Sequence, residues 1–164
     1  MSIMRRVWLL AVLALAALGG ASCRSEPDVM QAISVTDVVT GWLDKGIVDG
    51  QNKLVPTISL RIRNGSDRPL SYIQLNAVFR IVDDTEELGS KVVRATEGSQ
   101  LEPGRTVGPF NLSSDLGYSS PASRTQMLQH SQFRDAKVDL FIKHGSRQWV
   151  RLGEYRIDRQ LFAR

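Results

Sequence analysis

The sequence predicts an all-β fold in which two antiparallel sheets pack as a sandwich of about seven strands. Apolar and polar residues alternate in several segments, as expected for strands with one buried and one solvated face. Clusters of Gly, Pro, Asn, Asp and Ser separate these segments at short intervals, which is typical of sandwiches. The chain has 164 residues, of which 42% are apolar, and this is enough for one domain with a proper core.

The clearest alternation covers residues 57–63, where Ile58, Leu60 and Ile62 share one face. Residues 64–69 are rich in turn formers. Alternation resumes over residues 72–81, and its apolar side carries Ile73, Leu75, Ala77, Phe79 and Ile81. Two alternating segments around a short turn are typical of a hairpin, so we predict that these two strands form an antiparallel pair.

The other strands follow the same rhythm. Residues 33–43 form a β-branched stretch that predicts a first strand. Segments 89–96 and 106–112 flank a turn at 101–104, and we expect them to pair. Near the end of the chain, residues 137–143 alternate through Val138, Leu140 and Ile142, and a turn at 144–147 leads into a strand over 148–157.

Residues 113–135 form one long connection that does not alternate. Its first part, 113–123, is rich in Ser, Gly and Pro, and residues 124–133 predict a short helix with Met127, Leu128 and Phe133 facing inward. Long connections are uncommon in compact domains and are often functional. Two interpretations stay open: a crossover that caps one end of the sandwich, which we favour, or a binding loop.

Residues 1–22 have the order of a secretory signal peptide. Arg5 and Arg6 precede an apolar run over residues 7–18, and small residues follow at 19–22. The run has 12 residues, whereas a membrane-spanning helix needs about 20. We therefore expect this segment to be removed from the mature protein.

Cys23 is the only Cys in the chain and comes directly after those small residues. The segment Leu18-Gly19-Gly20-Ala21-Ser22-Cys23 resembles the cleavage site of bacterial lipoprotein precursors, with Gly20 where an aliphatic residue is usual. The resemblance implies that Cys23 becomes the acylated N-terminus, that 23–30 form a tether and that 31–164 form a single domain. Because Arg24 stands where an Asp would favour inner-membrane retention, it also implies an outer-membrane protein facing the periplasm. Cleavage after Ala21 by the ordinary signal peptidase, which gives a secreted protein, remains the alternative.

A second resemblance concerns the strands. Residues 64–70 followed by 79–83, together with the turn at 101–104 and Phe110, resemble the bacterial FxLYD domain and related immunoglobulin-like envelope modules. Ile81 and Val82 stand where that family has Leu and Tyr. The resemblance covers about residues 33–112 and part of the final hairpin. It implies an immunoglobulin-like sandwich and no chemistry.

Charge and composition exclude several function classes. The chain has 21 Lys and Arg, 17 acids and a net charge of +4. Removal of 1–22 deletes two Arg and no acid, which leaves a mature charge of +2 and no support for nucleic-acid binding. One Cys and two His exclude a disulfide framework and a zinc site of Cys and His clusters.

We predict no catalytic, metal or cofactor residues. His130 and His144 lie beside expected loops or strand ends, and no Gly-x-Ser-x-Gly elbow occurs. An envelope hydrolase would need Ser and carboxylate groups to converge on one of these His residues. The acidic residues at 83–84 and 86–87 are predicted to be a solvated hairpin tip.

The sequence therefore predicts a non-enzymatic cell-envelope lipoprotein that serves as an interaction or assembly module for another envelope protein. The alternative is a secreted or periplasmic small-ligand or glycan binder, with Tyr118, Trp149 and Tyr155 around one end of the sandwich. The possible contact surface is Tyr118, Trp149, Arg151 and Tyr155. The final segment is also basic, and its bases are Lys143, Arg147, Arg151, Arg156, Arg159 and Arg164. They form either a positive stripe that binds an acidic partner or a solvated outer face of the sheet.

Overall fold

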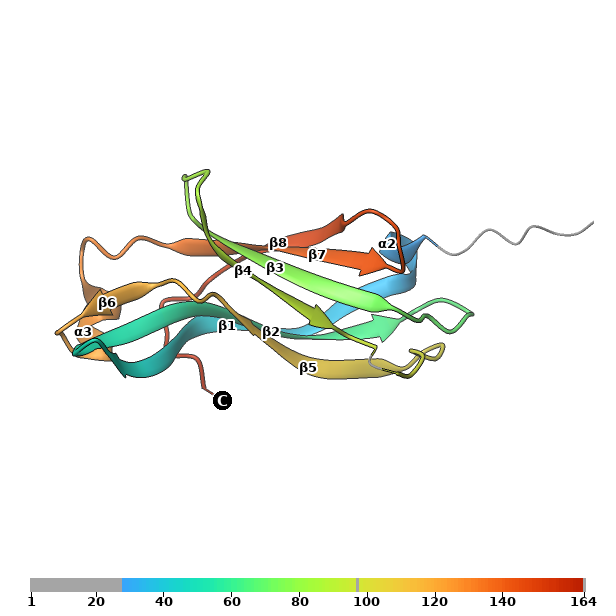
Figure 1. Ribbon diagram of the computed structural model, residues 1–164, viewed down its shortest axis with the longest axis horizontal. Coiled ribbons are helices and arrows are strands. Elements are labelled where there is room, and N and C mark those ends of the chain that lie inside the picture. Colours follow the sequence, from blue (N-terminus) through green and yellow to red (C-terminus); the bar gives the residue numbers. More distant parts are fainter. Residues whose placement is uncertain (1–27, 97, 164) are drawn as a thin grey trace, which may run out of the picture.

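The computed structural model describes residues 28–96 and 98–163, and these form two antiparallel sheets packed face to face (Figure 1). The predicted all-β sandwich is therefore confirmed. The first sheet contains β1 (Ile33–Val48), β2 (Gln51–Asn64), β5 (Thr106–Ser113) and β6 (Tyr118–Ser120), with β5 and β6 both paired to β2. The second has the order β4 (Glu87–Arg94), β3 (Ile73–Ile81), β7 (Ala136–His144) and β8 (Val150–Arg156). Two short helices, α2 (Val29–Ala32) and α3 (Arg124–Gln129), complete the described elements.

Two of the predicted strand pairs are wrong. Strands β2 and β3 lie in different sheets, because residues 65–72 cross from one sheet to the other. Strands β4 and β5 are separated in the same way, and β5 pairs with β2. Alternation shows which face of a strand is buried but does not show which strand lies beside it. Packed sheets are only about 10 Å apart, so a short connection reaches either neighbour.

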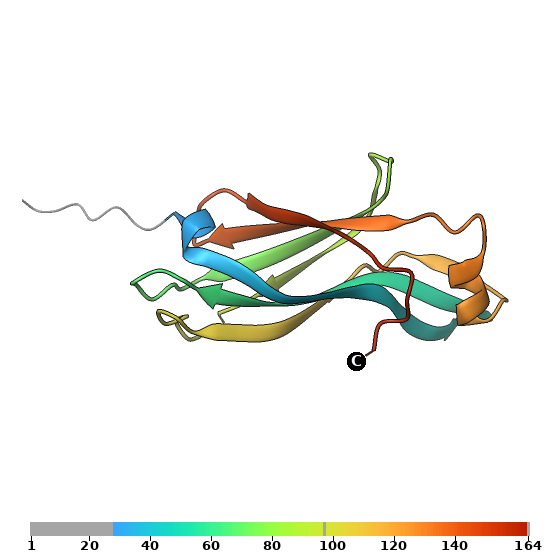
Figure 2. The same ribbon diagram turned by 180° about the vertical axis from the view of Figure 1, so that it is seen from behind.

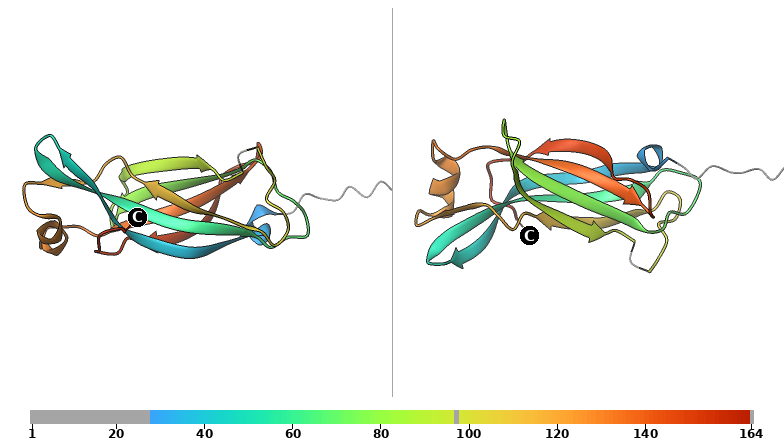
Figure 3. Two further views of the ribbon diagram at one scale, coloured as in Figure 1. Left: turned by 90° about the horizontal axis from the view of Figure 1, so that it is seen from below. Right: turned by 45° about the horizontal axis from the view of Figure 1, so that its top comes forward.

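The hairpin of β1 and β2 is longer than predicted. The expected first strand ended at Leu43, whereas β1 continues to Val48. Register shifts between Thr36 and Val39 and between Asp44 and Ile47 interrupt the alternation, which hid the second half of the strand. The tip of this hairpin extends past the body of the sandwich on the side of α3 (Figure 3).

The core lies between the sheets, on the faces that alternation predicted. Ile58, Leu60 and Ile62 of β2 are fully buried. They face Val138, Leu140 and Ile142 of β7 and the inward side of β3, and all of these side chains belong to one hydrophobic cluster. Ile81, the last predicted member, is only half-buried at the edge of the cluster. Burial of a side chain of this size stabilises a fold by about 1.5–3 kcal/mol.

After β8 the chain leaves the second sheet and runs beside β1 of the first (Figure 2). The Trp42 amide donates to the Gln160 carbonyl, and the Phe162 amide donates to the Trp42 carbonyl, each at 2.8 Å. Gly41 permits this approach, because a Cβ there would lie 3.1 Å from the Gln160 carbonyl oxygen. Residues 158–162 thus cover part of the edge of β1.

The two ends of the sandwich differ. One end, here called the N-terminal end, carries Asp28, α2 and the connections 65–72, 98–105 and 144–149. The opposite end, the α3 end, carries the hairpin tips at 49–50 and 82–86 and residues 114–135 (Figure 1). In the described part of the chain, no helix is long and apolar enough to cross a membrane.

Candidate functional site at the α3 end

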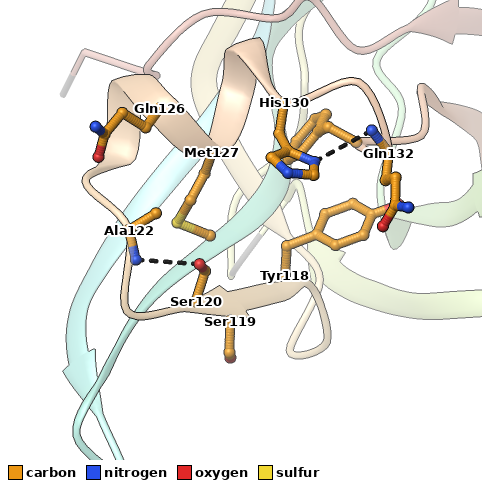
Figure 4. A pocket seen from close by; sticks show the side chains of 9 residues that line it. Tyr118, Ser119, Ser120, Ala122, Gln126, Met127, His130 and Gln132 are labelled. Carbon is orange, nitrogen blue, oxygen red and sulfur yellow. Dashed lines mark hydrogen bonds between the residues drawn. The ribbon is translucent and has the colours of Figure 1, made fainter.

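Strand β6 and helix α3 enclose a hollow of about 670 Å³ at the α3 end (Figure 4). The side chains of Tyr118, Met127 and His130 lie around this space, while Gln126 projects from the outer side of the helix. The lining residues come from β6, from α3 and from the segment after it, and they are Tyr118, Ser119, Ser120, Ala122, Gln126, Met127, His130, Gln132 and Phe133. The long connection predicted at 113–135 therefore supplies the whole hollow.

Helix α3 is held by its cap and by one ion pair. The Gln126 amide donates to the Ser123 hydroxyl at 3.4 Å, and the Ser123 amide donates to the Gln126 side-chain oxygen at 3.0 Å. These reciprocal bonds form a capping box. Arg124 Nε lies 2.8 Å from Asp44 Oδ2, which ties the helix to β1. The helix was predicted over 124–133, and it ends instead at Gln129.

The inward side of this connection follows the prediction. Met127 and Leu128 are the buried residues of α3, and Phe133 is 5% exposed. All three belong to the hydrophobic core cluster. The connection thus caps the sandwich, as the favoured interpretation predicted, and it also lines the hollow.

Strand β6 was not predicted, because Ser and Gly hide its short β pattern. Its three residues pair with β2, from Leu54 opposite Tyr118 to Asn52 opposite Ser120. Gly117 precedes the strand, and a Cβ there would lie 2.0 Å from the Leu54 carbonyl oxygen. Only a glycine lets the backbone approach β2 this closely.

The rings of Tyr118 and Phe133 form a floor for the hollow, and the buried Trp42 ring packs behind them. The Tyr118 ring lies 4.5 Å from Phe133 and 5.5 Å from Trp42, measured between centroids. Trp42 and Phe133 meet edge to face at 4.6 Å. The Arg159 guanidinium carbon lies 5.5 Å from the Phe133 ring centroid, and its Nη2 donates to the Phe133 carbonyl at 2.6 Å. Such ring pairs stabilise a structure by about 0.5–1.5 kcal/mol beyond their burial.

The rim of the hollow is polar without being charged. Of the described residues, no Asp, Glu, Lys or Arg lines it. His130 Nδ1 accepts a hydrogen bond from the main-chain amide of Gln132 at 3.2 Å, and the Tyr118 hydroxyl donates to the main-chain carbonyl of Arg134 at 3.4 Å. An apolar or aromatic group would fit the floor, and the hydroxyl and amide side chains would satisfy its polar neighbours.

The structure does not bring the predicted contact residues together. Tyr118 lines the hollow, whereas Trp149 lies at the N-terminal end beside the β7–β8 turn. Tyr155 packs against the core, and burial raises the pKa of its phenol. Arg151 binds Asp139 and Glu154. A ligand site lined jointly by Tyr118, Trp149 and Tyr155 is therefore not formed.

Three bases of the final segment are paired with carboxylates, so the segment does not form a continuous free positive stripe. Arg151 contacts Asp139, and Arg156 and Arg159 both contact Asp135, at 2.6 Å and 2.5 Å. Hydrogen bonds from Arg159 and then Arg156 hold the pKa of Asp135 below its ordinary value. Arg164 lies outside the described residues.

The remaining candidates for chemistry also lie apart. His130 follows α3 at one end, and His144 ends β7 at the other. Of the four acids predicted for a hairpin tip, Asp83, Asp84 and Glu86 lie in the β3–β4 connection, whereas Glu87 begins β4. There the Glu86 amide and Arg134 lower the pKa of Asp84. Within the residues the structure describes, no group of three His, Cys, Asp or Glu could hold a metal ion.

The signal-peptide segment and the lipidation candidate Cys23 lie outside the described residues. No family model matches the chain, and no curated protein matches it.

Proposed function

We propose that the protein is a non-enzymatic, lipid-anchored cell-envelope protein whose sandwich serves as an interaction or assembly module on the periplasmic side of the outer membrane. The signal-peptide order of residues 1–22 and the lone Cys23 support the anchor. The observation that carries the proposal is the position of the hollow, at the opposite end of the sandwich from Asp28.

The tether is too short to reverse this arrangement. Five residues lead from Cys23 to Asp28, a span of at most about 18 Å. An acylated Cys23 would therefore keep the N-terminal end close to the lipid. The hollow at the α3 end would then face away from that membrane, where another envelope protein can reach it.

The lining of the hollow favours a protein partner that inserts one apolar or aromatic side chain. The aromatic floor offers contact area, and the flexible thioether of Met127 adapts to different shapes. Gln126 and Gln132 at the rim are both exposed and can bond to a partner's main chain. Anchor side chains of this kind carry most of the affinity in protein interfaces.

The partner is tested by crosslinking in the cell. A photoreactive residue replaces Gln132 in the rim or, as the control, exposed Asn111 on β5. Tagged protein is then captured from the membrane fraction and analysed by mass spectrometry. One or two proteins should crosslink at position 132 only and should be lost with Cys23→Ala. Identical products from both positions, or monomer alone from both, would contradict the proposal.

A second candidate function is glycan or small-ligand binding, which the uncharged rim favours. A neutral sugar could stack on the Tyr118 ring and bond to the Ser, Gln and His side chains around it. Titration calorimetry with neutral envelope oligosaccharides tests this function. Tyr118→Ala should abolish binding, whereas Trp149→Ala, which changes an aromatic residue at the other end, should retain it.

A further inference from the structure

We infer that the N-terminal end of the sandwich is an electrostatic docking surface for anionic phospholipid headgroups. The orienting charge belongs to the folded domain and is additional to any acyl chain. The identity of the membrane rests on the proposed function, but the docking surface itself can be tested without the anchor.

Four basic residues lie at or beside strand ends at the N-terminal end of the molecule. Arg63 is the second-last residue of β2 and Arg94 the last of β4, while Arg105 directly precedes β5. Lys143 is the second-last residue of β7. Arg63 pairs with Thr106, beside Arg105, and Arg94 and Lys143 both lie opposite Gln74. The basic group therefore spans both sheets.

The three arginines of this group have no carboxylate partner among the described residues, and all three are exposed. Lys143 lies 5.8 Å from the Trp149 ring centroid. Arginines nearer the α3 end behave differently. Each of these arginines contacts an aspartate. The arginines are Arg80, Arg124, Arg134, Arg151, Arg156 and Arg159. The three arginines at the N-terminal end are thus available to an external anion, whereas the arginines nearer the α3 end are already paired with aspartates.

The acids are distributed in the opposite sense. At the N-terminal end Asp28 caps α2, Asp67 lies 3.9 Å from Arg68, and Glu102 is exposed. Glu97 belongs to the β4–β5 connection but lies outside the described residues. Arg68 and Arg147 also lie at this end, but both already have interactions within the protein, so the docking surface does not depend on them. The α3 end carries more acids than bases: its acids are Asp44, Asp49, Asp83, Asp84, Glu86, Glu87, Asp115 and Asp135, and its bases are Lys45, Lys53, Arg124 and Arg134.

This separation gives the molecule a positive N-terminal end and a negative α3 end. An anionic surface attracts the first and repels the second, so one orientation is favoured. Exposed aromatic side chains lie at the same positive end. Tyr72 is 75% exposed, and its carbonyl accepts from the Gly145 amide at 3.0 Å, which places it beside the turn that leads to Trp149. Tyr and Trp are enriched where lipid headgroups meet water.

The test uses the mature chain with Cys23→Ser, so that no acyl chain contributes. Its sedimentation with vesicles of phosphatidylcholine, with or without phosphatidylglycerol, is compared at low and high salt. Binding should require phosphatidylglycerol and should weaken with salt. The double variant R63Q/R94Q should bind about tenfold more weakly. The matched variant K45Q/K53Q removes the same charge at the α3 end and should bind within about twofold of the parent.

Orientation has its own readout. Trp42 and Trp149 are the tryptophans of the mature chain, and Trp42 is fully buried. Brominated phosphatidylglycerol vesicles should quench the fluorescence of the parent and leave that of Trp149→Phe unchanged. Equal losses in both double variants would show that only net charge matters and would overturn the docking surface, as would equal binding to neutral vesicles.

Failure of the anchor and failure of the docking surface are distinguishable. Mass spectrometry of the full chain extracted from membranes reports whether Cys23 carries acyl groups. An unmodified Cys23 with selective vesicle binding overturns the proposed anchor and keeps the docking surface. An acylated Cys23 without selective vesicle binding overturns only the docking surface.

Discussion

At the scale of single residues, Asn64 joins the connections of the N-terminal end. It is fully buried, and its side-chain amide donates to the carbonyls of Arg68 at 2.7 Å and Leu101 at 2.8 Å. Its side-chain oxygen accepts from the Ser66 amide and hydroxyl. Its whole hydrogen-bonding capacity is therefore used within the protein, and it holds the crossing 65–72 against the connection 98–105.

Replacement of Asn64 by Ala should destabilise the fold by about 3 kcal/mol, because it leaves buried carbonyl groups without donors. Urea unfolding followed by circular dichroism measures the change. Asn111→Ala removes the same group from an exposed position on β5 and should stay within about 0.5 kcal/mol of the parent. Similar midpoints for the two variants would show that the Asn64 network contributes little.

Asp135 makes the stability depend on pH. Its pKa in the folded state is lowered, chiefly by hydrogen bonds from Arg159 and Arg156, below the value of about 3.9 expected in the unfolded chain. The ion pairs therefore stabilise the fold fully above about pH 4, and this contribution is lost as the pH falls through the folded-state pKa.

Asp135→Asn should be less stable than the parent by about 1 kcal/mol at pH 7, and the two proteins should converge once the pH falls below the folded-state pKa of Asp135. The urea unfolding midpoints of the two proteins, measured at pH 7 and at a series of lower pH values, test this. Asp49→Asn, which changes an exposed turn, should have the same urea midpoint as the parent at every pH. A difference in stability between the Asp135 variant and the parent that does not change with pH would contradict the role of the Asp135 ion pairs.

At the scale of elements, alternation predicted which segments are strands and which faces are buried, but not how the strands pair. Ile58, Leu75 and Val138 are buried as expected because burial of one face is a local property of the pattern. Pairing depends on where each connection crosses the sandwich, and the turn-rich residues 65–69 fit a hairpin as well as a crossing. The bulges in β1 and the Ser-rich β6 also lack a local signal.

The candidate site was predictable only in part. The length and composition of residues 113–135 left a capping crossover and a binding loop open, and of the predicted contact residues only Tyr118 lines the hollow. Its partners Trp42 and Phe133 reach it from β1 and from beyond α3, so only the fold brings the three rings together. Trp149 and Tyr155 share its aromatic character but not its location.

Strand β6 supports the hollow, so its attachment to β2 can be tested at Gly117. Gly117→Ala places a methyl group against the Leu54 carbonyl and should cost about 2–3 kcal/mol. It should also change the chemical shifts of Tyr118 and Met127 in NMR spectra. Gly65→Ala is the control, because a Cβ there meets nothing closer than 3.6 Å. Equal effects of the two variants would contradict the close approach of β6 to β2.

At the scale of the whole molecule, residues 158–162 connect the two sheets through β1. Removal of residues 158–164 should lower stability and cause the protein to associate through the uncovered edge of β1, because open strand edges pair with other chains. Size-exclusion chromatography with light scattering measures association. Removal of residues 163–164 alone keeps both bonds to Trp42 and should leave a monomer. If the longer truncation also stays monomeric, the segment does not protect the edge.

This arrangement has a consequence for biogenesis. The hydrogen bond from the Asp158 amide to the Thr40 hydroxyl joins positions 118 residues apart. If the chain is exported as proposed, it crosses the membrane from its N-terminus, so β1 would emerge long before the residues that cover its edge. During that interval the growing chain offers an open strand to any neighbour in the same compartment. Under the proposed export, closure of the edge would be a late step of folding, and a chaperone of the receiving compartment would be most effective at that step.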